Sequence, residues 1–202
     1  MISNLKSIYG NRCSGIKINY EGIFVNSPAK ELPLCEAISY SFNVPLLVKN
    51  TNIPCIGSRR SLGLLEYENE LVHYLHKHSK VSAEAIKKAL KDIPVISSPF
   101  ENIFLGIPEN LESKIQPDLF IIYMKPKDAM ELVQLYAAKT DKFPVIKPYT
   151  FLSVCGNIIA QTYKKKQVNV SFGCTESRKH GSIDDNMIIV GLPFHIGSLL
   201  FN

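Results

Sequence analysis

Short apolar runs separated by Gly and Pro set the pattern of this chain. The clearest run, LFIIYM at 119–124, is continuously apolar and predicts a strand that is buried on both faces. Further strands are expected at 15–20, 23–25, 46–48, 102–106, 168–172 and 187–190. The last two lie close enough in sequence to be antiparallel neighbours.

Helical patterns lie between these runs. Pro126 and Asp128 begin a predicted helix that extends to residue 140, with Glu131 three positions after Asp128, as in a capping box. Thr150 is the expected N-cap of a helix over 151–163, and Ser82 that of a helix over 83–91. Further helices are expected over 35–42, at the end of the loop 53–63, and within 66–79.

Strands and helices in this order predict an α/β (or α+β) fold: a single domain, 1–202, with a mixed sheet and packed helices. A chain of 202 residues can bury a sizeable core in one domain. Two lobes, 1–110 and 111–202, are the alternative.

Composition and charge narrow the function classes. A hydrophobic content of 46% with 20% charged residues is ordinary for a soluble globular protein. No window approaches 18 consecutive apolar residues, and no apolar stretch follows the first charges, so we expect no membrane span, no secretory signal and a cytoplasmic protein. The net charge of +5 is spread along the chain, so we expect no nucleic-acid partner.

The five cysteines carry the most informative chemistry. An odd number in a chain expected to be cytoplasmic argues against a disulfide framework. Metal or cluster ligation, a reactive thiol and inert buried thiols remain open. Four of the five lie beside Pro or Gly or at the end of a predicted element: Cys35, Cys55, Cys155 and Cys174.

Four thiolates suit an iron–sulfur cluster or tetrahedral zinc, and turns near glycine leave N–H groups free to hydrogen-bond bound sulfur. Because the ligands are scattered, we favour a cluster over a zinc knuckle. Cys13 is the cysteine to leave out first.

Two arginines follow these cysteines by four residues, Arg59 after Cys55 and Arg178 after Cys174. If the two loops meet, the guanidinium groups would lie beside thiolates and attract an anionic ligand. The alternative is surface charge with partners such as Asp184 and Asp185, which themselves fit a turn better than an acid–base pair.

Three histidines, His73, His76 and His78, lie on a predicted helix. His73 and His76 share a face and could hold zinc. A solvated helix face is the favoured interpretation, because no carboxylate partner is evident.

Most of the chain resembles a widespread prokaryotic family catalogued as domain of unknown function family 169. The residues that carry the resemblance are Pro117-Asp118, the helix 128–140, Asn169-Val170-Ser171-Phe172-Gly173-Cys174 with Arg178 and Asp184-Asp185, Gly191-Leu192-Pro193, and more loosely Leu34-Cys35-Glu36-Ala37, Cys55-Ile56-Gly57 and Leu62-Gly63. The resemblance implies that residues 35, 55, 155 and 174 are family positions. Ser177 departs from relatives that carry a second cysteine in a Cys-x-x-Cys-Arg arrangement.

The sequence therefore predicts a cytoplasmic iron–sulfur or metal-thiolate protein, with a [4Fe-4S] cluster ahead of zinc. An open cluster site for an anionic or sulfur-bearing small molecule, and a homodimer or a redox protein partner, are further expectations. The alternative is a cofactor-free module that binds an anionic metabolite or a protein partner.

Overall fold

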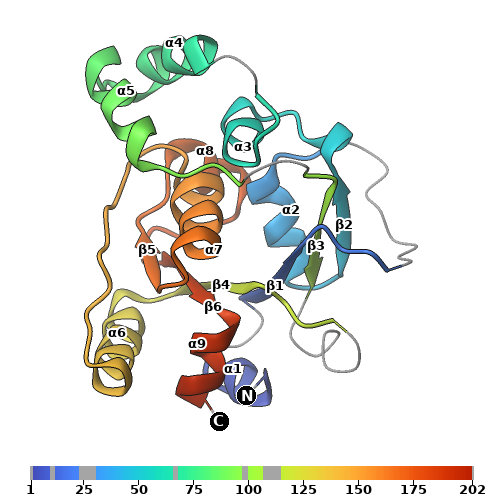
Figure 1. Cartoon of the computed structure of the whole chain (residues 1–202), viewed down its shortest axis with the longest axis vertical. Coiled ribbons are helices and arrows are strands. Elements are labelled where there is room, and N and C mark those ends of the chain that lie inside the picture. The colour runs from blue at the N-terminus through green and yellow to red at the C-terminus, as the bar shows by residue number, and fades with distance from the viewer. Residues whose placement is uncertain are drawn as a thin grey trace.

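A six-stranded sheet in the order β2-β3-β1-β4-β6-β5 runs through the middle of the molecule (Figure 1). The computed structural model describes residues 2–9, 12–22, 31–65, 68–96, 100–106 and 115–201. The strands are β1 (Cys13–Ile18), β2 (Leu46–Lys49), β3 (Asn102–Gly106), β4 (Leu119–Met124), β5 (Asn169–Ser171) and β6 (Ile188–Pro193). The strand expected at 23–25 lies outside the described residues.

Every pairing between these strands is antiparallel, including the predicted pairing of β5 with β6. The predicted α/β domain with packed helices is confirmed. The sheet is antiparallel where a mixed one was expected. Connections that skip one strand place the next strand parallel to the first but not beside it, so no parallel pair forms. Strands from both halves of the chain share this sheet, since β1 pairs with both β3 and β4.

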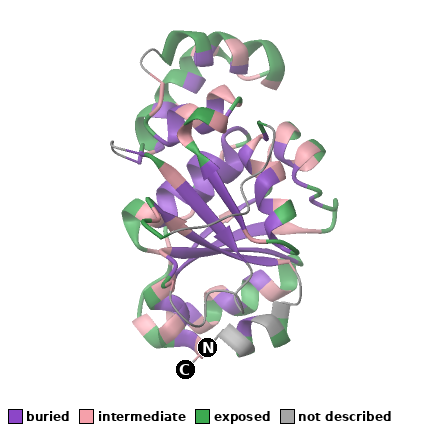
Figure 2. Cartoon of the chain, turned by 90° about the vertical axis from the view of Figure 1, so that its right-hand side faces the viewer, coloured by how far each residue is buried: buried purple, intermediate pink, exposed green. Residues whose placement is uncertain are grey.

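Alternating side chains of the sheet enter two hydrophobic clusters, one on each face. Figure 2 shows the strands of the sheet largely in the colour of buried residues. In β4, Leu119, Ile121 and Tyr123 enter the larger cluster. Phe120, Ile122 and Met124 enter the smaller one. This confirms the prediction that β4 is buried on both faces.

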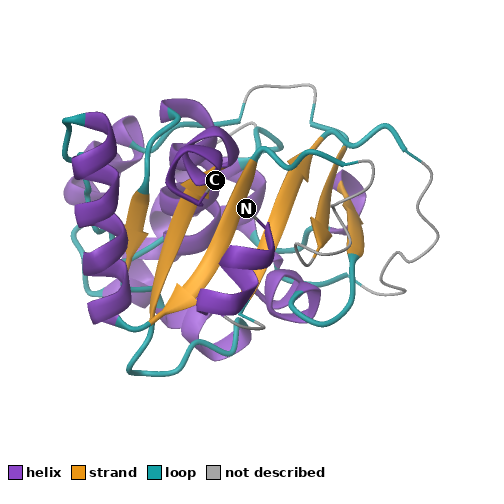
Figure 3. Ribbon diagram, turned by 90° about the horizontal axis from the view of Figure 1, so that it is seen from below, coloured by secondary structure: helices purple, strands orange, loops and turns teal. Residues whose placement is uncertain are grey.

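Helices cover both faces (Figure 3). The larger cluster is covered by α2 (Leu34–Ser41), α3 (Ile56–Ser61), α4 (Glu68–Ser79), α5 (Ala83–Asp92) and the π-helix η3 (Ser153–Ala160), which continues into α7 (Gln161–Lys165). The smaller cluster is covered by α1 (Ile2–Tyr9), α6 (Pro126–Thr140) and α9 (Phe194–Phe201). A short 3-10 turn, η1 (Asn50–Asn52), follows β2.

The predicted helix starts are only partly correct. Ser82 caps α5 as expected, since its hydroxyl accepts a hydrogen bond from the backbone N–H of Ala85 at 3.2 Å. The capping box at Asp128 is wrong, because Pro126 occupies the first helical position and makes Lys125 the N-cap, without a side-chain bond. Thr150 is not a cap either, because η3 begins after Leu152, whose backbone is left-handed at φ 50°.

The segment between β5 and β6 also differs from the prediction. No helix was expected there, but its basic residues belong to a helix, α8 (Thr175–His180). Only Asp184 and Asp185 lie in the turn that leads to β6. No helix among the described residues is long and apolar enough to cross a membrane.

Candidate functional site

A cavity of about 360 Å³ opens on the larger-cluster side of the sheet, between α2, α3, η3 and α8 and beneath α4. Its volume is within the range of small-molecule sites, about 300–1,000 Å³. Figure 1 shows α3 and α8 close together below the α4–α5 pair. These elements come from separate segments, so the cavity exists only in the folded chain.

The four cysteines singled out from the sequence all line this cavity: Cys35, Cys55, Cys155 and Cys174. All are free thiols. Each lies at the start of a helix. Cys55 and Cys174 are the N-cap residues of α3 and α8, Cys35 is the second residue of α2, and Cys155 is the third residue of η3. Backbone N–H groups without an intrahelical partner therefore lie near every thiol.

Two glycines allow the close packing that joins Cys55 to Cys155. A Cβ on Gly57 would lie 2.4 Å from the Leu152 side chain. A Cβ on Gly156 would lie 2.8 Å from Ile93 and 3.2 Å from the Ser61 hydroxyl. A larger residue at either position would push α3 and η3 apart. Gly57 and Gly156 therefore allow the backbones of these two helices to approach closely.

The π-helix widens the chain at Cys155. The amide groups of Gly156 and Asn157 both donate to the carbonyl oxygen of Leu152, at 2.9 and 2.8 Å. Such π-turns are concentrated at functional sites, because they displace one side chain from the regular helical register. Here the displaced turn carries Cys155 into the cavity wall.

Burial changes the acidity of two thiols. Desolvation raises the pKa of Cys155 to about 12, although hydrogen bonds from the Ser61 and Ser58 hydroxyls partly oppose this rise. Desolvation also raises the pKa of Cys35, and charge on the other three cysteines raises it further. Negative charge on Cys55 or Cys174 therefore disfavours the ionisation of both Cys35 and Cys155. A bound cation would offset that repulsion and release protons.

Buried amide side chains hold the Cys155 helix against the strand that leads to Cys174. Asn157 donates to the carbonyl oxygen of Val170 at 3.3 Å and accepts from Gln161 at 3.1 Å. Asn169 donates to the hydroxyl of Thr162 at 3.2 Å. These contacts give a physical reason for a buried asparagine at the start of the segment that ends in Cys174.

Arg178 fixes the loops around Cys174 rather than facing the cavity. Its guanidinium donates to the carbonyl oxygens of Phe172, Asp184 and Met187, and lies 3.8 Å from the Asp185 carboxylate. Arg178 does not line the cavity. Its predicted contact with an anionic ligand stays a prediction.

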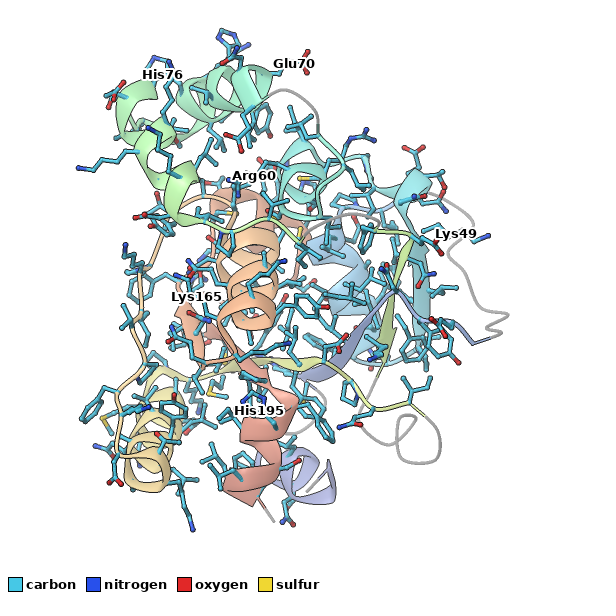
Figure 4. The ribbon with its side chains drawn as sticks, in the orientation of Figure 1. Lys49, Arg60, Glu70, His76, Lys165 and His195 are labelled. Atoms are coloured by element: carbon cyan, nitrogen blue, oxygen red, sulfur yellow. The ribbon has the colours of Figure 1, made fainter. Side chains whose placement is uncertain are left out.

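Arg59 and Arg60 adjoin in sequence but differ in their surroundings. Arg59 makes one long hydrogen bond, 3.4 Å to the carbonyl oxygen of Leu64, and does not line the cavity. Arg60 is only 5% exposed and binds the Glu68 carboxylate at 2.8 Å and the carbonyl oxygens of Leu90 and Ile93 at 2.6 Å. Figure 4 shows Arg60 below the α4–α5 pair that it anchors.

Cys13 lies apart from the other four cysteines. It is 1% exposed and belongs to the smaller cluster, on the opposite face of the sheet. Burial raises its pKa to about 12. It packs beside Phe120 and Ile122 as an apolar residue, which agrees with its omission from the predicted site.

Sequence reasoning missed the polar residues that α4 and α8 contribute to the cavity lining. Tyr74 and His78 line the cavity from α4, with ring centroids 4.6 Å apart. His180 and Glu176 line it from α8, with the imidazole Nε2 3.4 Å from the carboxylate. In both pairs the residues are spaced i, i+4, which places their side chains on one helix face. This spacing is the sequence signal from which the two pairs could have been predicted.

Only one of the three histidines on α4 lines the cavity. His73 and His76 are exposed, which agrees with the solvated face favoured above, and only His78 reaches the lining. Within the described ranges, no group of three or more His, Cys, Asp or Glu is set to hold a metal ion.

The comparisons with known proteins agree on the family. The sequence model of the DUF169 family, described as "Uncharacterised ArCR", matches residues 16–198. "Uncharacterized protein MJ0308" of Methanocaldococcus jannaschii is 29% identical over 113 residues, which cover 54% of this chain and 46% of that protein. The chain thus matches about half the length of this curated relative. No solved structure matches. Since the family model spans most of the sequence, this chain belongs to the DUF169 family.

Proposed function

We propose that this protein binds an iron–sulfur cluster through Cys35, Cys55, Cys155 and Cys174. One observation carries the proposal: these four thiols, chosen on their sequence surroundings, line the same cavity. Soft thiolate donors select iron–sulfur clusters and zinc over magnesium or calcium. Cys13, on the other face of the sheet, has no part in this site.

A [4Fe-4S] cluster is favoured over a single zinc ion. Tetrahedral zinc bound at about 2.3 Å needs four sulfurs gathered around one point. The four cysteines come from four separate helix starts around one cavity. In a cluster each cysteine binds a different iron, so the sulfurs stay further apart and surround a larger volume.

The surroundings of the thiols suit bound sulfur. The Ser58 and Ser61 hydroxyls lie near Cys155 and act to lower the pKa of its thiol, and hydrogen bonds to cluster sulfurs help to set the reduction potential. Much of the cavity lining is apolar, including Leu71, Leu75, Phe151, Leu152 and Val154.

A small molecule beside the cluster remains part of the proposal. If only three of the four thiols held the cluster, its fourth iron could bind a small molecule. The Tyr74–His78 and His180–Glu176 pairs line the same cavity and are proposed as further contacts of an anionic or sulfur-bearing ligand, beside the predicted contacts of Arg59 and Arg178. Electron transfer and sulfur chemistry both fit this arrangement.

A cytoplasmic location, with a homodimer or a redox protein as partner, completes the proposal. All five cysteines are free thiols, as expected in a reducing compartment.

The second candidate is a cofactor-free module that binds a small anionic molecule in the same cavity. It is favoured by the raised pKa of Cys35 and of Cys155, which keeps these thiols protonated when no cation is bound. In this case the thiols are lining groups only.

Anaerobic purification separates the two candidates. The first predicts a brown protein with broad visible absorption, stoichiometric iron and sulfide, and a paramagnetic signal after reduction. Zinc in elemental analysis would keep the metal site and remove the redox chemistry. A colourless, metal-free protein after anaerobic reconstitution with iron and sulfide would overturn the first candidate and leave the second.

A further inference from the structure

Ser177 is a buried serine in the first turn of α8, at the cavity wall. The residue is only 2% exposed. Its hydroxyl accepts a hydrogen bond from the backbone N–H of Cys174 at 2.8 Å and donates one to the carbonyl oxygen of Cys174 at 3.0 Å. A single side chain therefore holds both backbone polar groups of a proposed cluster ligand.

The chain turns sharply just before this contact. Gly173 has a left-handed φ of 85°, and a Cβ there would lie 3.3 Å from the Ser177 hydroxyl. Cys174 follows in the extended conformation, at φ −111° and ψ 169°, as the N-cap of α8. Cys174 thus lies between a left-handed residue and a helix. The direction of its thiol depends on how its own backbone is held, and the Ser177 hydroxyl ties the N–H of Cys174 to the helix.

The same turn of α8 meets a second proposed ligand. The Cys35 thiol donates to the carbonyl oxygen of Glu176 at 3.9 Å. Cys35 belongs to α2, which comes from a distant part of the chain. A displacement of the first turn of α8 would therefore move Cys174 and alter the contact with Cys35 at the same time.

We infer that Ser177 is a positioning residue, whose hydroxyl fixes the first turn of α8 so that Cys174 and Cys35 can bind the same cluster. This inference rests on the proposed function. Ser177 is not itself assigned as a ligand, because its hydroxyl is already engaged both as donor and as acceptor. Outer-shell partners of this kind orient the groups that bind a metal.

The test is Ser177→Ala, loaded by anaerobic reconstitution with iron and sulfide. The substitution removes the hydroxyl and adds no bulk to a buried position. The variant should release its iron to a chelator with a rate constant about 10–100-fold above that of the wild type, the range by which loss of an outer-shell partner weakens metal sites. Iron release is normalised to the iron bound per folded protein at the start.

The matched control is Ser82→Ala. Ser82 also stands at a helix start, and its hydroxyl accepts the backbone N–H of Ala85 at 3.2 Å. It caps α5 and does not line the cavity. Both substitutions remove a hydroxyl that secures a helix start, but only Ser177→Ala should accelerate iron release. Melting temperatures of the metal-free proteins show how far each variant is destabilised.

Amide hydrogen exchange in the metal-free protein tests the hydrogen bond itself. In the wild type the Cys174 amide should exchange slowly, because its N–H is bound to a buried hydroxyl. In Ser177→Ala it should exchange faster, while the amides of the central strand β4 keep their protection. This pattern would show a local change in a folded protein.

The outcomes separate this inference from the proposed function. A loaded Ser177→Ala protein that releases iron at the wild-type rate would overturn the inference and leave the cluster proposal standing. Equal acceleration in Ser82→Ala would also overturn it, because stability alone would then explain the iron loss. A Cys174 amide that exchanges in the wild type as fast as an exposed loop amide would count against it even if Ser177→Ala did not fold. A wild-type protein that takes up no iron would overturn the proposed function, and this inference with it.

Discussion

The guanidinium of Arg60 lies 2.6 Å from the carbonyl oxygen of Leu90, and so joins the helix that begins after Cys55 to the last turn of α5. A second bond of 2.6 Å, to Ile93, and the Glu68 ion pair complete the contact. The α4–α5 pair above the cavity is therefore attached to α3, the short helix whose N-cap is the cavity residue Cys55.

Arg60→Met should destabilise the protein by about 1.5–3 kcal/mol, the range for hydrogen bonds made by a charged group. The substitution keeps most of the side-chain volume but leaves two carbonyl oxygens without their donor. Urea unfolding followed by circular dichroism measures the change. The control is Arg59→Met, which should stay within about 0.5 kcal/mol of the wild type. Equal effects of the two substitutions would contradict this account.

Cys174→Ser should lose most of the iron that the wild type retains after anaerobic reconstitution, because a hydroxyl is a poor ligand for a soft metal centre. Cys35→Ser should behave in the same way. Iron and sulfide analysis, normalised to folded protein, gives the measurement. Cys13→Ala is the matched control and should keep full metal content, since Cys13 lies across the sheet from the cavity. Unchanged iron in Cys174→Ser would remove that residue from the ligand set.

Gly156→Ala should destabilise the fold by about 1–3 kcal/mol, the usual cost of an inserted methyl group in a packed interior. Its Cβ would lie 2.8 Å from Ile93 at the end of α5 and 3.2 Å from the Ser61 hydroxyl of α3, so η3 must move away from both. Because Cys155 precedes this glycine, metal retention should fall together with stability. The free energy of unfolding and the iron content of the same preparation test both effects. A variant with wild-type values in both measurements would show that α3 and η3 can separate without cost.

Alkaline pH should weaken the metal-free protein through its buried thiols. The pKa of Cys13 rises from its usual 9.0 in the unfolded chain to about 12 in the fold. Between these values the unfolded state has released a proton that the native state still holds, so the free energy of unfolding falls as pH rises. The contribution of Cys13 is complete below pH 9.0 and is lost on the way to pH 12.

Unfolding curves of wild type and Cys13→Ala across this interval isolate the effect, because tyrosines and lysines titrate in both proteins. The wild type should lose more stability than the variant between pH 9.0 and about 12. Parallel pH profiles would show that this thiol titrates alike in the folded and unfolded states.

Much of the fold could be predicted from local pattern. The run at β4 and the periodicity of α4, α5 and α6 identify themselves, because burial on a strand or helix requires apolar residues at fixed spacing. Helix starts were less predictable. Asp128 and Thr150 have suitable side chains, but Pro126 and the left-handed Leu152 determine where the helices begin.

The sequence by itself determined that four cysteines lie beside Pro or Gly or at the end of a predicted element, because Pro and Gly act on their immediate neighbours. Only the tertiary structure decided which thiols share a cavity. Cys13 lies on the other face of the sheet because side chains along β1 alternate between the two faces. Arg60 was buried and Arg59 left outside by the packing of α5. The cavity likewise depends on α2, η3 and α8 meeting, and contacts between segments so far apart leave no trace in local sequence pattern.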